Sequence, residues 1–403
     1  MKLNVLLLEG IHAVAETALV EAGHDVRRIG GALKEDQLIE QLEGVHFLGI
    51  RSKTNVTKRV LDAPSAKSLL SIGAFCIGTN QVALEHAMRK GICVFNAPFS
   101  NTRSVAELVI SEIVALSREL GDRVQEMHQG VWRKTASGSR EVRGKTLGVI
   151  GYGHIGTQVG ILAEFFGMRV LFYDVAAKLP LGNAQVVGAL DTLLAESDFV
   201  TLHVPETPQT KLMIGPAQLA QMKKGACLIN ASRGTVVDID ALADALKREH
   251  LHGAAVDVYP EEPESSDTKG FKTALQGLHN VILTPHIGGS TMEAQENIGR
   301  EVAASLARYA ELGTTTSSVN FPHCELGVTP GTWRLMHVHQ NVPGVLRDVN
   351  RVIGDAGANI HAQLLSTNSD IGYLMIDLDS DVVPQVVEGL KKLPTTIQAS
   401  PLV

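Results

Sequence analysis

Short apolar runs alternate, over most of the first 290 residues, with longer stretches in which apolar residues recur every three or four positions. The short runs fit buried parallel strands, and the longer stretches fit helices that cover a sheet. In the first 100 residues the pattern predicts strands at 5–8, 47–50, 69–72 and 94–96, with helices such as 13–22 and 35–42 between them. A longer amphipathic helix is predicted at 104–120. The alternation predicts an α/β protein with doubly wound sheets.

Three glycines follow the apolar run at 147–150, and they are Gly151, Gly153 and Gly156. The first allows a tight turn, the second lets the backbone approach a pyrophosphate, and the third lets helix and strand pack closely. Three glycines in six residues also occur in ordinary turns, but the flanking strand and helix favour a dinucleotide site. Asp174 follows the next predicted strand, where its charge suits ribose hydroxyls and opposes a 2′-phosphate. The cofactor predicted is therefore NAD.

Further strands are predicted at 199–204, 226–230, 253–258 and 281–283, and polar side chains follow three of them. These side chains are Arg233, Glu262 and His286. Because the carboxyl ends of parallel strands meet at one edge of a sheet, we expect all three to lie at that edge. Histidine can take the proton of a hydroxyl group that is being oxidised, and a carboxylate on its other nitrogen fixes the tautomer. An arginine can hold a carboxylate and polarise a carbonyl oxygen. The combination predicts a catalytic site, although each residue alone is more often structural.

A polar loop directly follows the predicted strand 47–50, and it begins with Arg51, Ser52 and Lys53. Two cations and a hydroxyl after a strand end suit a carboxylate or phosphate ligand. A solvated surface loop has the same composition. Both interpretations stay open on the residues alone.

The last 70 residues carry no catalytic motif and follow a polar, glycine- and proline-bearing boundary at 313–332. Strands are predicted at 334–340, 359–367, 371–378 and 396–402, with helices at 345–356 and 382–392. The order βαββαβ is the ferredoxin-like pattern.

Composition excludes several classes of protein. The net charge is −7, which argues against a nucleic-acid binder with a broad basic face. No apolar run approaches the length of a membrane span, and the first residues predict a strand and not a signal peptide. The four cysteines are far apart, without a CxxC pair, so neither a disulfide framework nor a metal site is predicted, and a cytoplasmic location is expected.

Several motifs resemble those of the NAD-dependent D-2-hydroxyacid dehydrogenases, and they are GYGHIG, LHVP, NASRGTVVD, DVYPEEP and TPHIGGST. The resemblance implies a Rossmann-type doubly wound NAD-binding domain at 101–291. It also implies a second, flavodoxin-like substrate domain, formed by 1–100 with 292–327. Arg233, Glu262 and His286 would be catalytic, and Arg51, Ser52 and Lys53 would bind substrate. Cofactor contacts would fall on Gly151, Gly153, His154, Ile155, Gly156, Asp174, Ala231, Ser232, Arg233, Asp257, His286, Ile287, Gly288 and Gly289. Tyr259 stands where the family usually has phenylalanine, and no functional consequence is expected.

The C-terminal pattern at 333–403 resembles an ACT domain, a regulatory module that binds amino acids. By that resemblance His339, Asn341 and Asn359 would bind L-serine, and a dimerisation module without an effector is the alternative. The implied activity is oxidation of 3-phospho-D-glycerate to 3-phosphohydroxypyruvate, the first step of serine biosynthesis, by a serine-inhibited homotetramer. A reductase of 2-oxoglutarate, hydroxypyruvate or glyoxylate, and a non-catalytic NAD-sensing scaffold, are the alternatives. Trp132, in a polar segment, either docks on a neighbouring subunit or anchors a core.

Overall fold

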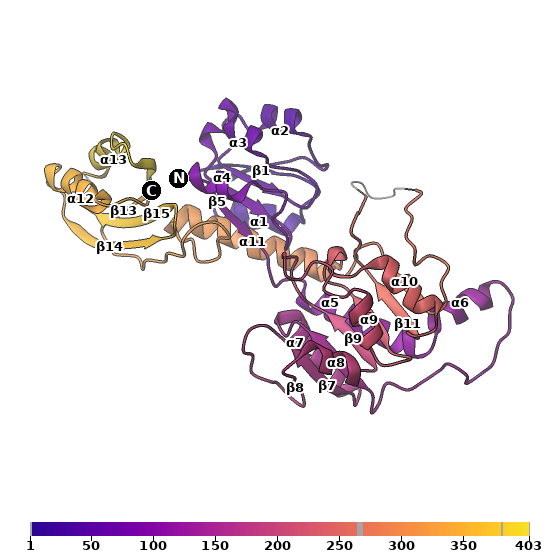
Figure 1. Ribbon diagram of the computed structural model, residues 1–403. Coiled ribbons are helices and arrows are strands. Elements are labelled where there is room, and N and C mark those ends of the chain that lie inside the picture. The colour runs from indigo at the N-terminus through magenta and orange to yellow at the C-terminus, as the bar shows by residue number, and fades with distance from the viewer. Residues whose placement is uncertain (1, 264–268, 380–381, 403) are drawn as a thin grey trace. The chain divides into compact units, whose positions relative to one another are not determined.

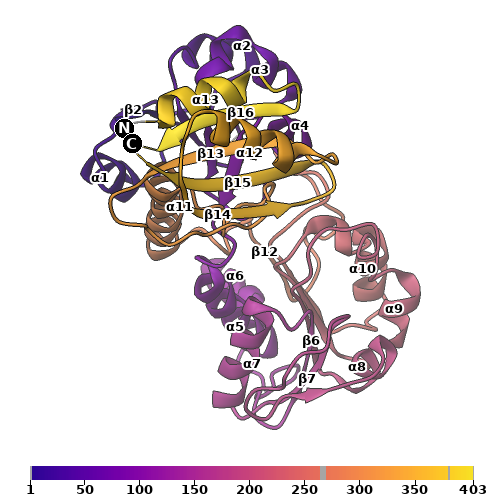
Figure 2. The ribbon, with the colours of Figure 1, turned by 90° about the vertical axis from the view of Figure 1, so that its left-hand side faces the viewer.

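Three β-sheets organise the chain, two with parallel strands and one with antiparallel strands (Figure 1, Figure 2). The computed structural model describes residues 2–263, 269–379 and 382–402. The chain separates into two units, one of residues 1–100 with 295–403 and one of residues 101–294. The α/β class predicted from the sequence is confirmed. The predicted division into three domains stays a prediction.

The first sheet of unit 1 has the flavodoxin-like order β2-β1-β3-β4-β5. Its strands are β1 (Asn4–Leu7), β2 (Asp25–Arg28), β3 (Phe47–Ile50), β4 (Ser71–Ala74) and β5 (Cys93–Asn96). Helices α2 (Glu35–Gln41) and α3 (Lys58–Asp62) pack on one face, and α1 (Ala13–Glu21) and α11 (Met292–Leu312) pack on the other. The short α4 (Leu84–Arg89) precedes β5. Tyr309 of α11 lies against Phe47 and Phe95 of the strands, so this core joins residues more than 200 positions apart.

The second sheet of unit 1 is antiparallel, with the order β14-β15-β13-β16. Its elements are β13 (Trp333–Gln340), α12 (Val345–Asp355), β14 (Ile360–Thr367), β15 (Ile371–Leu378), α13 (Val383–Lys391) and β16 (Thr396–Leu402). The two helices cover one face, and Met336, Val338 and Tyr373 on the other face join the core of the first sheet. Arg334 and Asp377 form a buried ion pair of 2.7 Å, and the guanidinium also donates to the Leu312 carbonyl. The predicted βαββαβ order is confirmed.

Unit 2 contains a seven-stranded parallel sheet in the order β12-β11-β10-β9-β6-β7-β8, which is a Rossmann order with one added strand. Its strands are β6 (Thr146–Ile150), β7 (Arg169–Tyr173), β8 (Gln185–Val186), β9 (Phe199–Leu202), β10 (Cys227–Asn230), β11 (Gly253–Val256) and β12 (Val281–Leu283). Helices α5 (Thr102–Ser117) and α7 (His154–Phe165) pack on one face. Helices α8 (Leu190–Glu196), α9 (Pro216–Gln221) and α10 (Ile239–Lys247) pack on the other.

The helix predicted at 104–120 is interrupted, and that prediction is wrong at its end. Glu119 adopts a left-handed conformation with φ of +49°, which breaks the helical hydrogen-bond ladder. A separate helix, α6 (Leu120–His128), therefore follows α5, and none of its residues is buried. The strand predicted at 69–72 also lies two residues later, at β4.

Candidate active site

The glycine turn follows β6, at the point where the strand order of the unit 2 sheet reverses, because β6 lies between β7 and β9. Open α/β sheets bind ligands at such a point. Gly151 has a φ of +90°, and a Cβ there would lie 2.5 Å from the His203 carbonyl oxygen. A Cβ on Gly156 would lie 2.1 Å from the Gly151 oxygen, whereas one on Gly153 would meet no described atom within 4 Å. Packing therefore requires the first and third glycines, and the second leaves room for a ligand.

Helix α7 begins with His154 and Ile155, directly after this turn. Backbone N–H groups and the positive dipole end of a helix suit a pyrophosphate there. The Asp174 carboxylate braces the turn, since its Oδ2 accepts from the Tyr152 N–H at 2.8 Å and its Oδ1 from the Ala176 N–H at 2.8 Å. Its contact with a ribose, and the repulsion of a 2′-phosphate by its charge, stay predictions. The turn therefore fits an NAD molecule.

His286 and Glu262 form a hydrogen-bonded pair, with His286 Nδ1 2.8 Å from Glu262 Oε2. The two side chains are 51% and 36% exposed, so the pair is accessible to a ligand. The bond to Glu262 raises the pKa of His286 above its ordinary value, although burial acts in the opposite direction. Burial also opposes ionisation of Glu262, but the bond to His286 and the nearby positive charges outweigh it and lower the pKa of Glu262. The pair thus makes the imidazole more basic than an ordinary histidine.

Arg233 lies close enough to this pair for its charge to lower the pKa of both partners. Its turn packs tightly on the segment before Glu262, because a Cβ on Gly234 would lie 1.9 Å from the Tyr259 carbonyl carbon. The Arg233 Nη1 donates to the Ser232 carbonyl at 2.7 Å. The structure therefore brings together the three predicted catalytic residues, all within unit 2.

Asp257 shapes the loop that carries His286, and its side chain is almost fully buried. Its Oδ1 accepts from the Thr284 hydroxyl at 2.6 Å and the Ile287 N–H at 2.8 Å, and its Oδ2 from the Gly288 N–H at 2.8 Å. Its carbonyl accepts from the N–H of His286, which has a φ of +55°. Asp257 was predicted as a cofactor contact, and that stays a prediction; in the structure its carboxylate holds the loop that carries His286.

The remaining predicted cofactor residues lie on the turn after β10 and on the loop after β12. Ala231 and Ser232 belong to the turn after β10, which buried Asn230 closes by donating to the Arg233 carbonyl at 3.0 Å. A Cβ on Gly289 would lie 2.4 Å from the Asn101 side chain. Their contacts with NAD stay predictions. Asn230 was missed, although an asparagine at a strand end before a tight turn is a recognisable signal.

The Tyr259 hydroxyl lies within hydrogen-bond distance of two carbonyl oxygens, 3.0 Å from that of Val256 and 3.1 Å from that of Thr284. Val256 ends β11 and Thr284 directly follows β12, so the hydroxyl ties the segment that carries Glu262 to the loop that carries His286. A phenylalanine could not make this connection. The tyrosine therefore has a structural role that the sequence did not indicate.

In unit 1, Arg51, Ser52 and Lys53 follow the carboxyl end of β3, as predicted. Arg51 is half-buried, whereas Ser52 and Lys53 are exposed. Backbone amides of this loop donate to the carboxylate of Glu9, at the end of the neighbouring β1. Sequence analysis did not single out Glu9.

The three predicted effector residues do not meet within one chain. Leu378 pairs with Trp333 on one side and Ile360 on the other, so Asn359 lies at the Trp333 end of the sheet. Asn341 lies beyond the opposite end of β13, about 25 Å away at the usual rise per residue. His339, near Asn341, is 2% exposed and its Nδ1 has no partner among the described residues.

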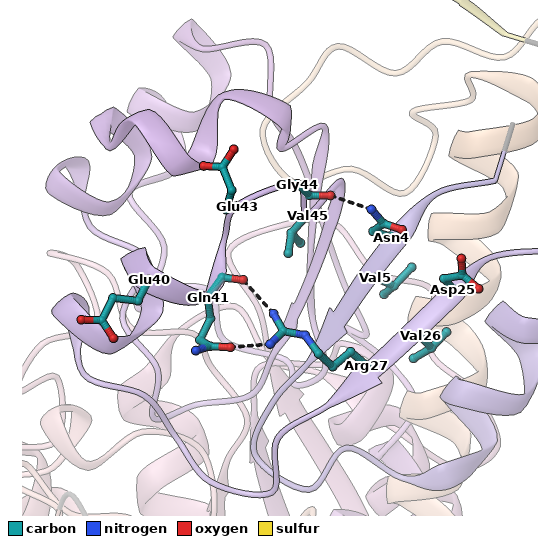
Figure 3. Close-up of a pocket in the computed structure, with 10 residues that line it drawn as sticks. All are labelled: Asn4, Val5, Asp25, Val26, Arg27, Glu40, Gln41, Glu43, Gly44 and Val45. Atoms are coloured by element: carbon teal, nitrogen blue, oxygen red, sulfur yellow. Dashed lines mark hydrogen bonds between the residues drawn. The ribbon is translucent and has the colours of Figure 1, made fainter.

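A pocket of about 570 Å³ lies elsewhere in unit 1, near the amino ends of β1 and β2 (Figure 3). Arg27 lines it but donates to the Oε1 and the carbonyl of Gln41. None of the predicted site residues lines this pocket. Within the described ranges, no three His, Cys, Asp or Glu side chains gather as a metal site, and no helix has the length and apolar character of a membrane span.

Comparisons with known proteins show which families the chain resembles. Residues 110–288 match the NAD-binding domain of D-isomer specific 2-hydroxyacid dehydrogenases, and residues 335–398 match the ACT domain of the AHAS small subunit type. The chain is 52% identical to D-3-phosphoglycerate dehydrogenase of Dictyostelium discoideum, over 98% of this chain and 96% of that one. It is 53% identical to the Escherichia coli K12 enzyme of the same name, over 99% and 97%.

Among solved structures, an NAD-complexed D-isomer specific 2-hydroxyacid dehydrogenase from Lactobacillus delbrueckii superposes with a TM-score of 0.69 at 27% identity, covering 79% of this chain and 100% of that one. The match confirms the predicted fold, and the predicted cofactor, NAD, is confirmed. The chain therefore belongs to the D-3-phosphoglycerate dehydrogenases, within the D-isomer specific 2-hydroxyacid dehydrogenase family.

Proposed function

We propose that this chain oxidises 3-phospho-D-glycerate with NAD to 3-phosphohydroxypyruvate, the first step of L-serine biosynthesis. The observation that carries the proposal is the 2.8 Å bond between His286 and Glu262 beside Arg233, on the nucleotide-binding sheet. A histidine held by a carboxylate, beside an arginine, is the arrangement required to take the proton of the C2 hydroxyl group of a 2-hydroxy acid.

The reaction follows from the roles of these three side chains. Nδ1 of His286 is held by Glu262, so Nε2 is the atom that takes the proton of the C2 hydroxyl. Glu262 fixes this tautomer and stabilises the imidazolium that forms. Arg233 holds the substrate carboxylate and stabilises charge on the C2 oxygen. NAD, when bound, accepts the hydride that leaves C2. In unit 1, Arg51, Ser52 and Lys53 bind the substrate phosphate.

The test is an NADH-absorbance assay of the purified protein. Addition of 3-phospho-D-glycerate and NAD is expected to produce NADH, and NADP in place of NAD is expected to give little, because of the Asp174 charge. L-serine is expected to lower the rate. Consumption of NADH with 2-oxoglutarate or glyoxylate, without turnover of phosphoglycerate, would instead establish a reductase, and NAD binding without any turnover would establish a scaffold.

L-serine is the proposed effector, bound by His339, Asn341 and Asn359 of the ACT domain. Because Asn341 and Asn359 lie at opposite ends of one sheet, a site that uses both takes one of them from each of two chains. If L-serine does not lower the rate in this assay, the alternative holds, in which the ACT domain is a dimerisation module without an effector.

The quaternary structure we propose is a homotetramer, supported by an unpartnered apolar stripe on α6. Leu120, Val124 and Met127 recur at helical spacing and are each about half exposed, and Trp132 beyond them is 79% exposed. The predicted alternative, in which Trp132 anchors a core, has no support from this exposure. Neighbouring subunits would cover the stripe.

Val124→Lys is expected to reduce the assembly, because it places a charge in the covered stripe. Gln125→Lys, the matched control, adds the same charge at the adjacent exposed position. Sedimentation velocity is expected to give four times the mass of one chain for wild type and control, and less for Val124→Lys. A monomeric wild type would refute the proposed tetramer.

We also propose a cytoplasmic location, since the four cysteines are free thiols, as is usual in a reducing compartment. Cell fractionation followed by the NADH assay tests this location.

A further inference from the structure

Glu9 occupies the backbone donors of the loop that follows β3. Its Oε1 accepts from the N–H of Arg51 at 3.1 Å and of Thr54 at 2.8 Å, and its Oε2 accepts from the N–H of Lys53 at 3.0 Å. One carboxylate therefore receives three hydrogen bonds from residues more than 40 positions away. Backbone N–H groups of one loop that converge on an anion form a concave anion site.

The carboxylate is itself held in place. Glu9 and Gly10 both have a φ of +59°, which is uncommon for glutamate, and the Glu9 N–H donates to the Gly31 carbonyl at 3.2 Å. A non-glycine residue persists in this conformation only when its surroundings stabilise it. The opposite side of the loop is also fixed, because Gln81 Nε2 donates to the Arg51 carbonyl at 2.7 Å. The loop backbone is thus held from two sides.

We propose that Glu9 is a positioning residue for substrate binding, which fixes the backbone of residues 51–54 so that the Arg51 and Lys53 side chains receive the phosphate. The inference rests on the function proposed above and adds to it how the phosphate is recognised. Since Glu9 already uses the N–H groups of Arg51, Lys53 and Thr54, recognition depends mainly on the side chains. The rival role is that of a placeholder, in which the phosphate displaces the carboxylate and takes the amides.

The two roles predict opposite effects of Glu9→Ala. A positioning residue, once removed, leaves the loop mobile, so the KM for 3-phosphoglycerate is expected to rise about tenfold, with kcat and the KM for NAD within roughly twofold of wild type. Glu9→Gln retains one acceptor oxygen and should restore part of the affinity. A placeholder, once removed, would lower the KM. Glu16→Gln is the matched control, since Glu16 pairs with Arg28 away from the loop.

Hydrogen exchange of the loop provides a second measurement that does not depend on turnover. The amides of Arg51, Lys53 and Thr54 are expected to exchange about tenfold faster in Glu9→Ala than in wild type or Glu16→Gln, with the β3 amides unchanged. An unchanged or lower KM, or unchanged loop exchange, would overturn the inference. A wild-type protein that does not oxidise phosphoglycerate would refute the proposed function and with it the substrate role of Glu9; an active wild type with an unaltered Glu9→Ala would refute only the inference.

Discussion

His286→Gln is expected to bind NAD with nearly unchanged affinity and to lose about 10³ in kcat, within the range that general acid–base residues contribute. Glutamine is uncharged and can still donate a hydrogen bond to Glu262, so the loop should remain in place. It cannot take a proton at neutral pH. The substitution therefore removes the proton acceptor and leaves the glycine turn intact.

Stopped-flow NADH formation gives kcat, and fluorescence titration gives the NAD affinity. A kcat within roughly threefold of wild type would contradict the assignment, because loss of a general base costs far more. A loss of NAD binding together with kcat would instead assign His286 to the cofactor site.

Glu262→Gln is expected to shift the pH dependence of kcat/KM in a defined direction. The hydrogen bond to Glu262 raises the pKa of His286, so without the carboxylate that pKa falls. Oxidation requires the neutral imidazole, and the acid limb of the kcat/KM profile should therefore move to lower pH in Glu262→Gln, while the plateau also falls. A residue with only a structural role would lower the plateau without moving the limb.

The sequence predicted the elements that carry strong local signals. The turn at Gly151 could be predicted because two of its glycines have no room for a side chain, and the proximity of Arg233, Glu262 and His286 because each follows a strand end. What could not be predicted are bonds between distant segments. Nothing near Asp257 in the chain indicates that its carboxylate would accept three bonds from residues 284–288.

Glu112 of α5 lies between these two cases, because the sequence carried a signal for it that sequence analysis did not use. Its carboxyl group is buried without a described hydrogen-bond partner, and burial, together with the charge of Asp257, raises its pKa to about 8. A signal existed, because Glu112 stands three positions after Val109 and four before Leu116, within the apolar stripe of the helix. A polar residue on such a stripe marks a site where local patterning and the fold disagree.

Arg51→Ala is expected to raise the KM for 3-phosphoglycerate by about 10- to 100-fold, the loss that follows removal of one hydrogen-bonded charge pair. D-glycerate lacks the phosphate but carries the same reacting centre, so its kcat/KM should change little. Arg59→Ala is the matched control, since this arginine of the same unit pairs with Glu35 and Asp36 and not with the substrate loop. The ratio of kcat/KM for the two substrates decides between interpretations. A fall in this ratio that is specific to Arg51→Ala assigns the phosphate to the loop. An equal loss for both substrates would mean that Arg51 only maintains the structure, and no loss for either substrate would support the solvated-loop interpretation.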